Sequence, residues 1–313
     1  MFRGFWVLSI LFLWWAKESM GSRSPLTHQV PIPSVSLVGG NEDLANQFKS
    51  VFTYSIDDNE LSGRCTGTKV APNHFLTAAH CFILQESDEI SVWPKSHKTP
   101  VIFYSFQQKV ENVKRVKTVK VTEVVFHPAL QQCFTQDKSE RESCIENTPD
   151  LAWVEIEKSR EFDEAPLVPL DLNRVTEGEY LTVVGYGYQQ AEDLTPPARK
   201  YHLSQVAPPE TLKKLYMDSS EDEDSVSDEL YFGTLGYLLG PQYASLGAGD
   251  SGGPVFRSIE GVSYVVGVNS FSFCPDSPSQ CEVTSNSFFA RIHRGGEFQI
   301  GEWLEALSPS SFR

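Results

Sequence analysis

The sequence is short of positive charge. Its 313 residues contain 26 Lys and Arg against 41 Asp and Glu, which gives a formal net charge of −15 at pH 7. Nucleic-acid binding requires clustered Lys and Arg to neutralise phosphates, so this balance argues against a nucleic-acid partner. It is typical of a soluble protein whose copies repel one another, and we expect a monomer.

The sequence also lacks an apolar segment long enough to cross a membrane. Its apolar N-terminal run, Phe5 to Ala16, is shorter than the roughly 20 residues that a spanning helix needs. Arg3 precedes this run and the small residues of Ser19-Met20-Gly21 follow it, so residues 1–21 are interpreted as a signal peptide. An uncleaved N-terminal anchor is the alternative. We expect a secreted protein, extracellular or periplasmic, without membrane contact after signal removal.

Metal-binding spacings are missing as well. None of the six cysteines forms a C-x-x-C pair, and no His/Cys spacing of the zinc kind occurs, so neither a metal nor another cofactor is expected. An even number of cysteines behind an export signal indicates disulfides, although spacing alone leaves their connectivity open.

Two charged segments carry little chemistry of their own. Residues 218–229 hold seven acidic side chains but lack the glycine and the spacing of an EF-hand loop, so a solvated insertion is favoured over a calcium site. Residues 109–120 hold five basic side chains, for which a strand with a solvated face is favoured over a heparin or nucleic-acid patch.

What the sequence does contain is a series of short apolar or alternating runs separated by turn residues. From Leu37 onward these runs predict many short strands and hence an all-β barrel or sandwich. Residues 22–36, rich in Pro and Ser, predict an extended lead-in. Near the C-terminus, apolar residues recur about one turn apart from Phe298 to Leu307 and predict a terminal helix.

The strongest chemical signal is Gly249-Asp250-Ser251-Gly252-Gly253-Pro254. A serine hydroxyl becomes a nucleophile only when a base removes its proton, and the carbonyl oxygen that it attacks becomes negative. Glycines around the serine allow a sharp turn that directs N–H groups toward that oxygen. Ser251 is therefore the candidate nucleophile, and the N–H groups of Gly249 and Ser251 are the candidate oxyanion hole.

A histidine and an acid complete the candidate set. Among seven histidines, His80 lies in Leu76-Thr77-Ala78-Ala79-His80-Cys81, at the end of an apolar strand, and is the candidate base. Asp150 heads the apolar run Leu151 to Ile156 and is the candidate carboxylate that orients the imidazole. The other histidines are interpreted as ordinary surface or core residues.

The segments 77–81, 149–156 and 249–254 resemble the three signature motifs of the trypsin/chymotrypsin family of serine proteases. The chain order His80, Asp150, Ser251 is also that of the chymotrypsin type and differs from the orders of subtilisins and α/β-hydrolases. The resemblance extends over residues 37–307. It implies two six-stranded antiparallel Greek-key barrels with a C-terminal helix, and residues 37–313 as one protease domain with the triad in the cleft between its barrels.

The resemblance implies further roles. Cys65 and Cys81 match the family's disulfide beside the histidine. Ser270-Phe271-Ser272 is similar to the strand that pairs with the substrate backbone, and Ser270 also corresponds to the serine that supports the aspartate. Leu37-Val38-Gly39-Gly40 resembles the new N-terminus freed by proteolysis, whose amine pairs with the acid before the nucleophile, here Asp250.

The chain departs from the family at several points. Ser36 rather than Arg or Lys precedes Leu37, so a different activating protease is expected to remove residues 22–36 as a propeptide. The usual disulfide near the serine is missing, and local pairs Cys274–Cys281 and Cys133–Cys144 are expected instead. Ser245 stands where a trypsin has its specificity aspartate. With Ser272 narrowing the pocket wall, no preference for basic residues is expected.

These features together predict an active serine endopeptidase that acts on polypeptide substrates. A catalytically silent homologue that uses the fold as a binding module is the main alternative. A hydrolase of another fold with accidental motifs is a further alternative, which the chain order disfavours.

Overall fold

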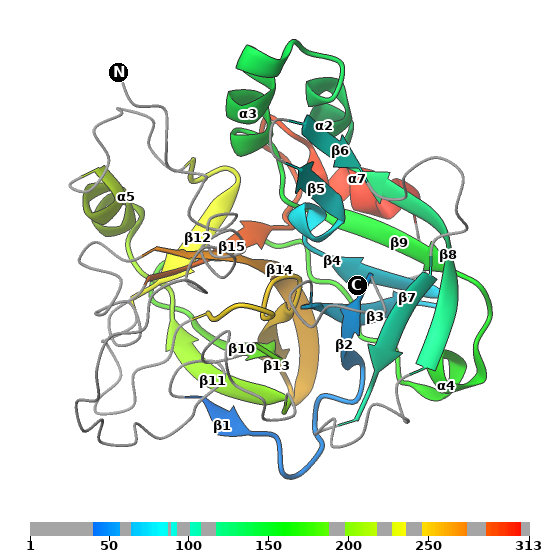
Figure 1. The fold of residues 1–313 in the computed structure, drawn as a ribbon. Helices are drawn as coiled ribbons and strands as arrows, with labels where there is room; N and C mark the ends of the chain where they lie inside the picture. Colours follow the sequence, from blue (N-terminus) through cyan, green and yellow to red (C-terminus); the bar gives the residue numbers. More distant parts are fainter. Residues whose placement is uncertain are drawn as a thin grey trace, which may run out of the picture.

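Two β-bodies make up most of the described chain (Figure 1). The computed structural model describes residues 40–56, 64–86, 89–92, 101–107, 117–187, 198–217, 227–235, 246–273 and 286–307. The predicted signal peptide (1–21), propeptide (22–36) and Leu37 lie outside the described residues. So do Ser245, Cys274 and Cys281.

The first body is a closed barrel of six antiparallel strands in the order β2-β3-β4-β9-β8-β7. Their bounds are Val51–Ser55 (β2), Arg64–Ala71 (β3), His74–Thr77 (β4), Val101–Ser105 (β7), Lys117–Phe126 (β8) and Ala152–Ile156 (β9). Aromatic side chains fill it: Phe52 makes edge-on contacts with Phe75, Tyr104 and Phe162. Large rings from facing strands bury much apolar area, which stabilises the closed form.

The second body is a seven-stranded sheet in the order β1-β11-β10-β13-β14-β15-β12. Its strands are Asn41–Glu42 (β1), Tyr180–Gly185 (β10), Lys200–Gln205 (β11), Tyr231–Thr234 (β12), Pro254–Ile259 (β13), Val262–Phe273 (β14) and Asn286–Arg291 (β15). The neighbouring strands pair antiparallel, and a bridge between Val206 and Thr234 joins the two sides of the curved sheet. The predicted all-β class with two barrel-like bodies is confirmed, with the second body an incompletely closed sheet.

Helices are short and lie at the periphery. They are Pro128–Cys133 (α2), Lys138–Glu146 (α3), Arg160–Glu164 (α4), Pro209–Met217 (α5) and Ile300–Leu307 (α7). The predicted terminal helix is confirmed as α7, where Ile300 and Leu304 are buried. Within the described part of the chain, no helix is long and apolar enough to cross a membrane.

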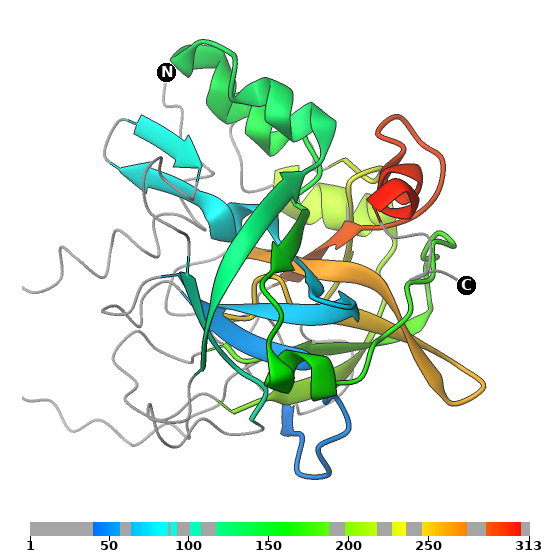
Figure 2. The same cartoon turned by 90° about the vertical axis from the view of Figure 1, so that its right-hand side faces the viewer.

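The α2–α3 hairpin was not predicted. Both Figure 1 and Figure 2 place it at one end of the first barrel, near the two-stranded hairpin formed by Ile83–Glu86 (β5) and Glu89–Val92 (β6). A disulfide between Cys133 and Cys144 joins the two helices, as expected from their local spacing. The α2–α3 hairpin leads directly into Pro149 and Asp150, so it lies beside the candidate site.

Candidate active site

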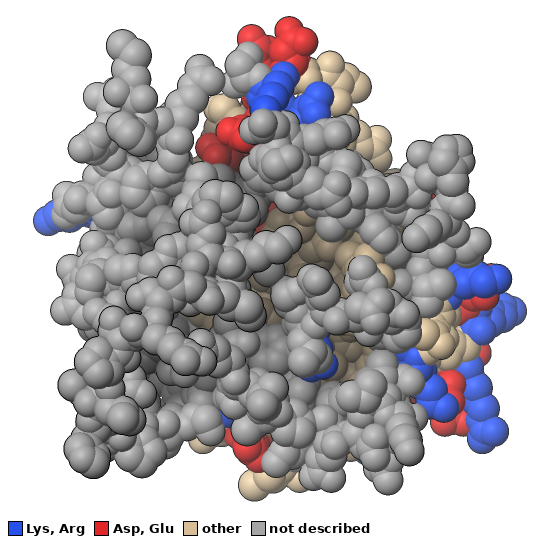
Figure 3. Space-filling model, viewed as in Figure 1, with Lys and Arg blue, Asp and Glu red and all other residues tan. Residues whose placement is uncertain are grey.

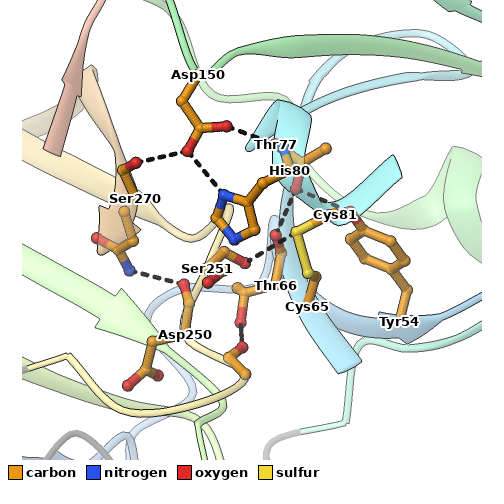
Figure 4. The surroundings of a disulfide bond; sticks show 12 residues. Tyr54, Cys65, Thr66, Thr77, His80, Cys81, Asp150, Asp250, Ser251 and Ser270 are labelled. Atoms are coloured by element: carbon orange, nitrogen blue, oxygen red, sulfur yellow. Dashed lines mark hydrogen bonds and ion pairs between the residues drawn. A yellow bond between two sulfur atoms is a disulfide. The ribbon is translucent and has the colours of Figure 1, made fainter. Parts of the chain in front are cut away.

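His80 is positioned by the end of β4. This strand pairs with β9 in a register that places Thr77 opposite Ala152. The segment that follows β4 and the segment that precedes β9 therefore meet at the same edge of the barrel. His80 follows in the 3₁₀ turn Ala79–Phe82, and a disulfide between Cys81 and Cys65 fastens that turn to β3 (Figure 4). The predicted Cys65–Cys81 pair is therefore confirmed.

Asp150 holds His80 at two points. Its Oδ1 accepts a hydrogen bond from the backbone N–H of His80 at 2.9 Å, and its Oδ2 lies 2.8 Å from Nδ1 of the imidazole. The Ser270 hydroxyl donates to the same Oδ2 at 2.5 Å. Asp150 is 6% exposed and His80 24% exposed, so one partner is buried while the imidazole still reaches the surface. This geometry fixes both the ring orientation and the tautomer.

The pKa shifts of this pair follow from their environment. Burial disfavours the charged imidazole, but the negative charge and the hydrogen bond of Asp150 outweigh it and raise the pKa of His80. Burial would likewise raise the pKa of Asp150, but the imidazole and the donors around the carboxylate lower it. Each group therefore stabilises the charged form of the other, as a carboxylate beside a base should.

Ser251 lies in a sharp turn before β13. Gly249 and Gly252 flank it with φ of 94° and 84°, values that favour glycine. A Cβ at Gly252 would also collide with the hydroxyl of Thr77. Figure 4 places Ser251 on the side of the His80 ring away from Asp150, with its backbone oxygen facing the disulfide sulfur of Cys81. The three predicted catalytic side chains, from distant parts of the chain, are thus neighbours.

The N–H groups of Gly249 and Ser251 have no hydrogen-bond partner among the described residues. Two adjacent free donors on a glycine-bordered turn can bind an oxygen that carries negative charge. They lie on the backbone of the same turn that presents Ser251.

Asp250 points the other way, into the second body. It is fully buried, and its carboxylate accepts hydrogen bonds from the backbone N–H groups of Gly187 at 2.6 Å and Gly247 at 2.8 Å. A side chain at Gly185 or Gly187 would collide with this carboxylate, which explains both glycines. The predicted pairing of Asp250 with the Leu37 amine remains a prediction, because Leu37 lies outside the described residues.

The α2–α3 hairpin packs against the His80–Asp150 pair. Leu130 from α2 and Ile145 from α3 line a small cavity together with His80 and Asp150. His127, directly before α2, places its Nε2 2.7 Å from the backbone oxygen of Phe298, beside α7. The sequence predicted the local Cys133–Cys144 pair here, but the polar α3 gave no helical pattern of apolar residues.

The predicted substrate strand is the outer part of β14. Ser270 is buried and bonded to Asp150, whereas Ser272 is exposed. The ring of Phe271 stacks on Phe288 at 4.7 Å between centroids and meets Tyr231 edge-on, so it packs inward. Ser245, the predicted pocket floor, lies outside the described residues, as does the expected Cys274–Cys281 pair.

The charged segments behave as ordinary surface where they are described. Lys117 and Lys120 at the start of β8 are exposed and pair with Glu161 and Glu157. On the face shown in Figure 3, Lys and Arg at this edge are interspersed with Asp and Glu rather than forming a patch of one sign. Of the acidic segment, Asp228 pairs with Arg174. The described residues contain no cluster of His, Cys, Asp and Glu that could hold a metal ion.

Sequence reasoning missed two polar residues that contact the nucleophile turn. Thr66 of β3 donates through its hydroxyl to the backbone oxygen of Gly249 at 2.8 Å. Asn269 of β14 donates through its side-chain amide to the backbone oxygen of Asp250 at 3.1 Å. Each lies next to a predicted residue, Cys65 and Ser270 respectively, and a polar side chain within a buried strand was the available signal.

Comparison with known proteins agrees with this geometry. A family model described as Trypsin matches residues 37–293, a range that contains His80, Asp150 and Ser251. The chain is also similar to Spermosin from Halocynthia roretzi, with 26% identity over 288 residues. That alignment covers 88% of this chain but only 63% of Spermosin, so the chain spans less than two thirds of this relative. Because the family match extends over well more than half of its length and the observed fold agrees with it, the chain belongs to the trypsin family.

Proposed function

We propose that this protein is a serine endopeptidase that cleaves peptide bonds through an acyl-enzyme intermediate. The observation that carries the proposal is the arrangement of His80 between a buried carboxylate and the Ser251 turn, with Asp150 2.8 Å from its Nδ1. A structural histidine has no need of a partly exposed ring that is fixed on one side and open toward a serine on the other.

The reaction proceeds in two halves. Ser251 Oγ forms a bond to the substrate carbonyl carbon as His80 Nε2 takes its proton, and the carbonyl oxygen becomes an anion that the N–H groups of Gly249 and Ser251 bind. The C–N bond then breaks as His80 returns the proton to the leaving amine. Water repeats the sequence on the acyl-enzyme, losing a proton to His80 and releasing the acid, while Asp150 stabilises the imidazolium throughout.

The processing steps form part of the proposal. Residues 1–21 are a signal peptide, 22–36 a propeptide and 37–313 the secreted protease domain, in which the freed Leu37 amine joins the Asp250 carboxylate. Full burial of Asp250 supports this assignment, since a buried carboxylate requires donors or a cation. Because Ser36 precedes the cut, another protease with a specificity other than for basic residues performs it.

Substrate specificity is assigned to the outer part of β14, which contains Ser270, and to a pocket whose floor is Ser245. The backbone of Ser270, Phe271 and Ser272 pairs with substrate, and Ser245 forms an uncharged pocket floor. A buried Lys or Arg side chain would lack a counter-ion there, which disfavours cleavage after basic residues.

A fluorophosphonate probe tests the proposal without knowledge of the substrate. Secreted protein whose N-terminus has been sequenced should be labelled, and both Ser251→Ala and His80→Ala should abolish labelling. Folded protein that begins at Leu37 and takes up no probe would overturn the proposal and favour a binding module. Mature protein with a different N-terminus would overturn the assigned cleavage site alone.

A further inference from the structure

The three backbone carbonyls of the nucleophile turn are all engaged by residues outside it. Gly249 O accepts from the Thr66 hydroxyl at 2.8 Å, and Ser251 O accepts from the Thr66 backbone N–H at 2.8 Å. Asp250 O accepts from the Asn269 side chain at 3.1 Å and also from the backbone N–H of Gly253 at 3.0 Å. The N–H groups of Gly249 and Ser251 are left unbonded within the described residues. The turn therefore leaves two donors unbonded while its three acceptors are engaged.

The two anchoring residues come from opposite bodies. Thr66 lies on β3 of the first barrel and Asn269 on β14 of the second sheet, and both are fully buried. Both also form a hydrogen bond at the end of β10. Thr66 Oγ1 accepts from the N–H of Tyr186, just after the strand, at 3.2 Å, and the Asn269 amide donates to Val184 O within it at 2.9 Å. The turn is thus braced from both sides of the interface between the bodies.

The planarity of the peptide bond turns these anchors into constraints on the donors. A peptide carbonyl and the following N–H lie in one plane and point in opposite directions, so fixing the oxygen fixes the N–H. The bonds from the Asn269 amide and from the Gly253 N–H to Asp250 O therefore together set the direction of the Ser251 N–H. The bond from Thr66 to Gly249 O fixes the peptide plane between Gly249 and Asp250, which connects the two peptide units that carry the donors. Gly249, with a φ of 94° and no Cβ, would otherwise allow this plane more freedom than another residue would.

Asn269 retains its amide at a cost. Its side-chain oxygen is buried and has no hydrogen-bond partner in the described part of the chain. A buried acceptor without a partner destabilises the folded state, and an apolar side chain would avoid this penalty. Both contacts of the amide nitrogen are to carbonyl oxygens, one of them in the nucleophile turn, so these contacts are what the residue contributes.

We propose that Thr66 and Asn269 are positioning residues for the anion-binding donors of the nucleophile turn. Asn269 holds the Ser251 N–H in its productive direction, and Thr66 holds the peptide unit between Gly249 and Asp250, which connects the two donors. The inference rests on the proposed function, in which these N–H groups stabilise the oxyanion. Neither side chain touches the reacting atoms. Each acts through the peptide units of the turn.

The test compares Thr66→Val with Thr68→Val. Both residues lie on β3 and are buried, but the Thr68 hydroxyl has no partner among the described residues, so removing it leaves the nucleophile turn intact. The readout is fluorophosphonate labelling of the mature protein, resolved into the maximal inactivation rate and the concentration for half-maximal rate. Thr66→Val should lower the maximal rate about 10- to 100-fold, less than the loss of an oxyanion donor itself, and leave the half-maximal concentration nearly unchanged.

Two companion variants separate positioning from general damage. Thr66→Ser keeps the hydroxyl and should label within about 3-fold of wild type, whereas Asn269→Leu loses both donors and should resemble Thr66→Val. If Thr66→Val does not fold, Thr66→Ala measured against Thr66→Ser decides the same question. The pH midpoint of labelling should be unchanged in these variants, because the His80–Asp150 pair is untouched.

The outcomes distinguish this inference from the proposed function. If wild-type protein is not labelled, the proposed function fails. If wild-type labelling depends on Ser251 but Thr66→Val and Asn269→Leu react as fast as Thr68→Val, the positioning role is wrong and the function stands. A lowered melting temperature with an unchanged maximal rate would likewise assign the two residues to folding alone.

Discussion

The hydroxyl of Ser270 donates to Asp150 Oδ2, the same oxygen that faces the imidazole of His80. With the His80 N–H on Oδ1, three donors immobilise one carboxylate at the junction of the two bodies. Ser270 belongs to β14 of the second sheet and Asp150 to the edge of the first barrel, so this bond couples the orientation of the base to the relative position of the bodies.

Loss of the Ser270 hydroxyl should slow the reaction without abolishing it. A hydrogen bond to a charged group contributes about 1.5–3 kcal/mol, so Ser270→Ala should lower the labelling rate roughly 10- to 150-fold. Ser263→Ala at the opposite end of the same strand is the control, because that serine is partly exposed and lies away from Asp150. Equal labelling rates for the two variants would show that Asp150 needs no support from Ser270.

The acidic limb of the pH profile should lie above the ordinary titration range of histidine. The base must be neutral to accept the Ser251 proton, and Asp150 raises the pKa of His80 above 6.5 despite its burial. The labelling rate should therefore increase with pH through a midpoint above 6.5. Asp150→Asn removes the charge that raises the pKa, and should lower that midpoint while reducing the rate by about 10⁴-fold. A wild-type midpoint below 6.5 would contradict the assigned pair.

The sequence indicated the candidate site residues but not the residues that hold them in place. His80, Asp150 and Ser251 could be chosen as candidates because their chemistry restricts residue type and because short motifs surround them, and the structure places them side by side. Thr66 and Asn269 carry no such mark: a threonine in a strand is ordinary by β-propensity, and a single buried asparagine has many uses. Their roles depend on which carbonyl lies within 3 Å, which only the packing of the two bodies decides.

The fold shows the same division. Alternating apolar runs predicted the strands of both bodies and the terminal helix, because burial on one face imposes a period. The helix α3 was missed because Lys138 to Glu146 is polar on nearly every side. It is held to the neighbouring helix α2 by a disulfide and has no apolar stripe that would reveal a helix in the sequence. In the described residues the second body has seven strands, where six were expected. Strand count is set by pairing at its edges, where β1 joins β11 over two residues.

His202 should make the folded protein sensitive to acid. It lies on β11 opposite Val183, is 4% exposed, and neither ring nitrogen has a partner in the described residues. Burial lowers its pKa from 6.5 to about 4. The unfolded chain therefore binds a proton that the folded chain excludes, and stability is lost as pH falls from 6.5 toward 4, by about 3 kcal/mol.

Urea unfolding at pH 7 and pH 4, in a Ser251→Ala background that prevents self-digestion, measures this loss. His202→Leu should reduce the difference in unfolding free energy between the two pH values by about 3 kcal/mol. His74→Gln, at a partly exposed histidine, is the matched control and should leave the difference nearly unchanged. An unaltered pH dependence in His202→Leu would mean that this imidazole is protonated, or solvated, in the folded state.

Arg199 and Asp43 form an ion pair with no exposed surface on either side chain. The guanidinium donates to Asp43 Oδ2 at 2.8 Å and to the backbone oxygen of Val51 at 3.1 Å, and Asp43 also accepts from the N–H groups of Gln47 and Phe48. The pair therefore fastens the segment just after the proposed new N-terminus to the edge of the second sheet. It is surrounded by enough donors and acceptors to satisfy both charges.

Removal of both partners should cost less unfolding free energy than the two single removals added together. Arg199→Met leaves a buried carboxylate without its cation and should cost about 3–5 kcal/mol of unfolding free energy. Asp43→Leu should cost a similar amount, because it leaves the buried guanidinium without its anion. The double variant leaves no buried charge, so its loss should be smaller than the sum of the two single losses by several kcal/mol. Additive losses would show that the two charges are solvated independently, and that the segment after residue 40 is held by its β1 pairing with β11 instead.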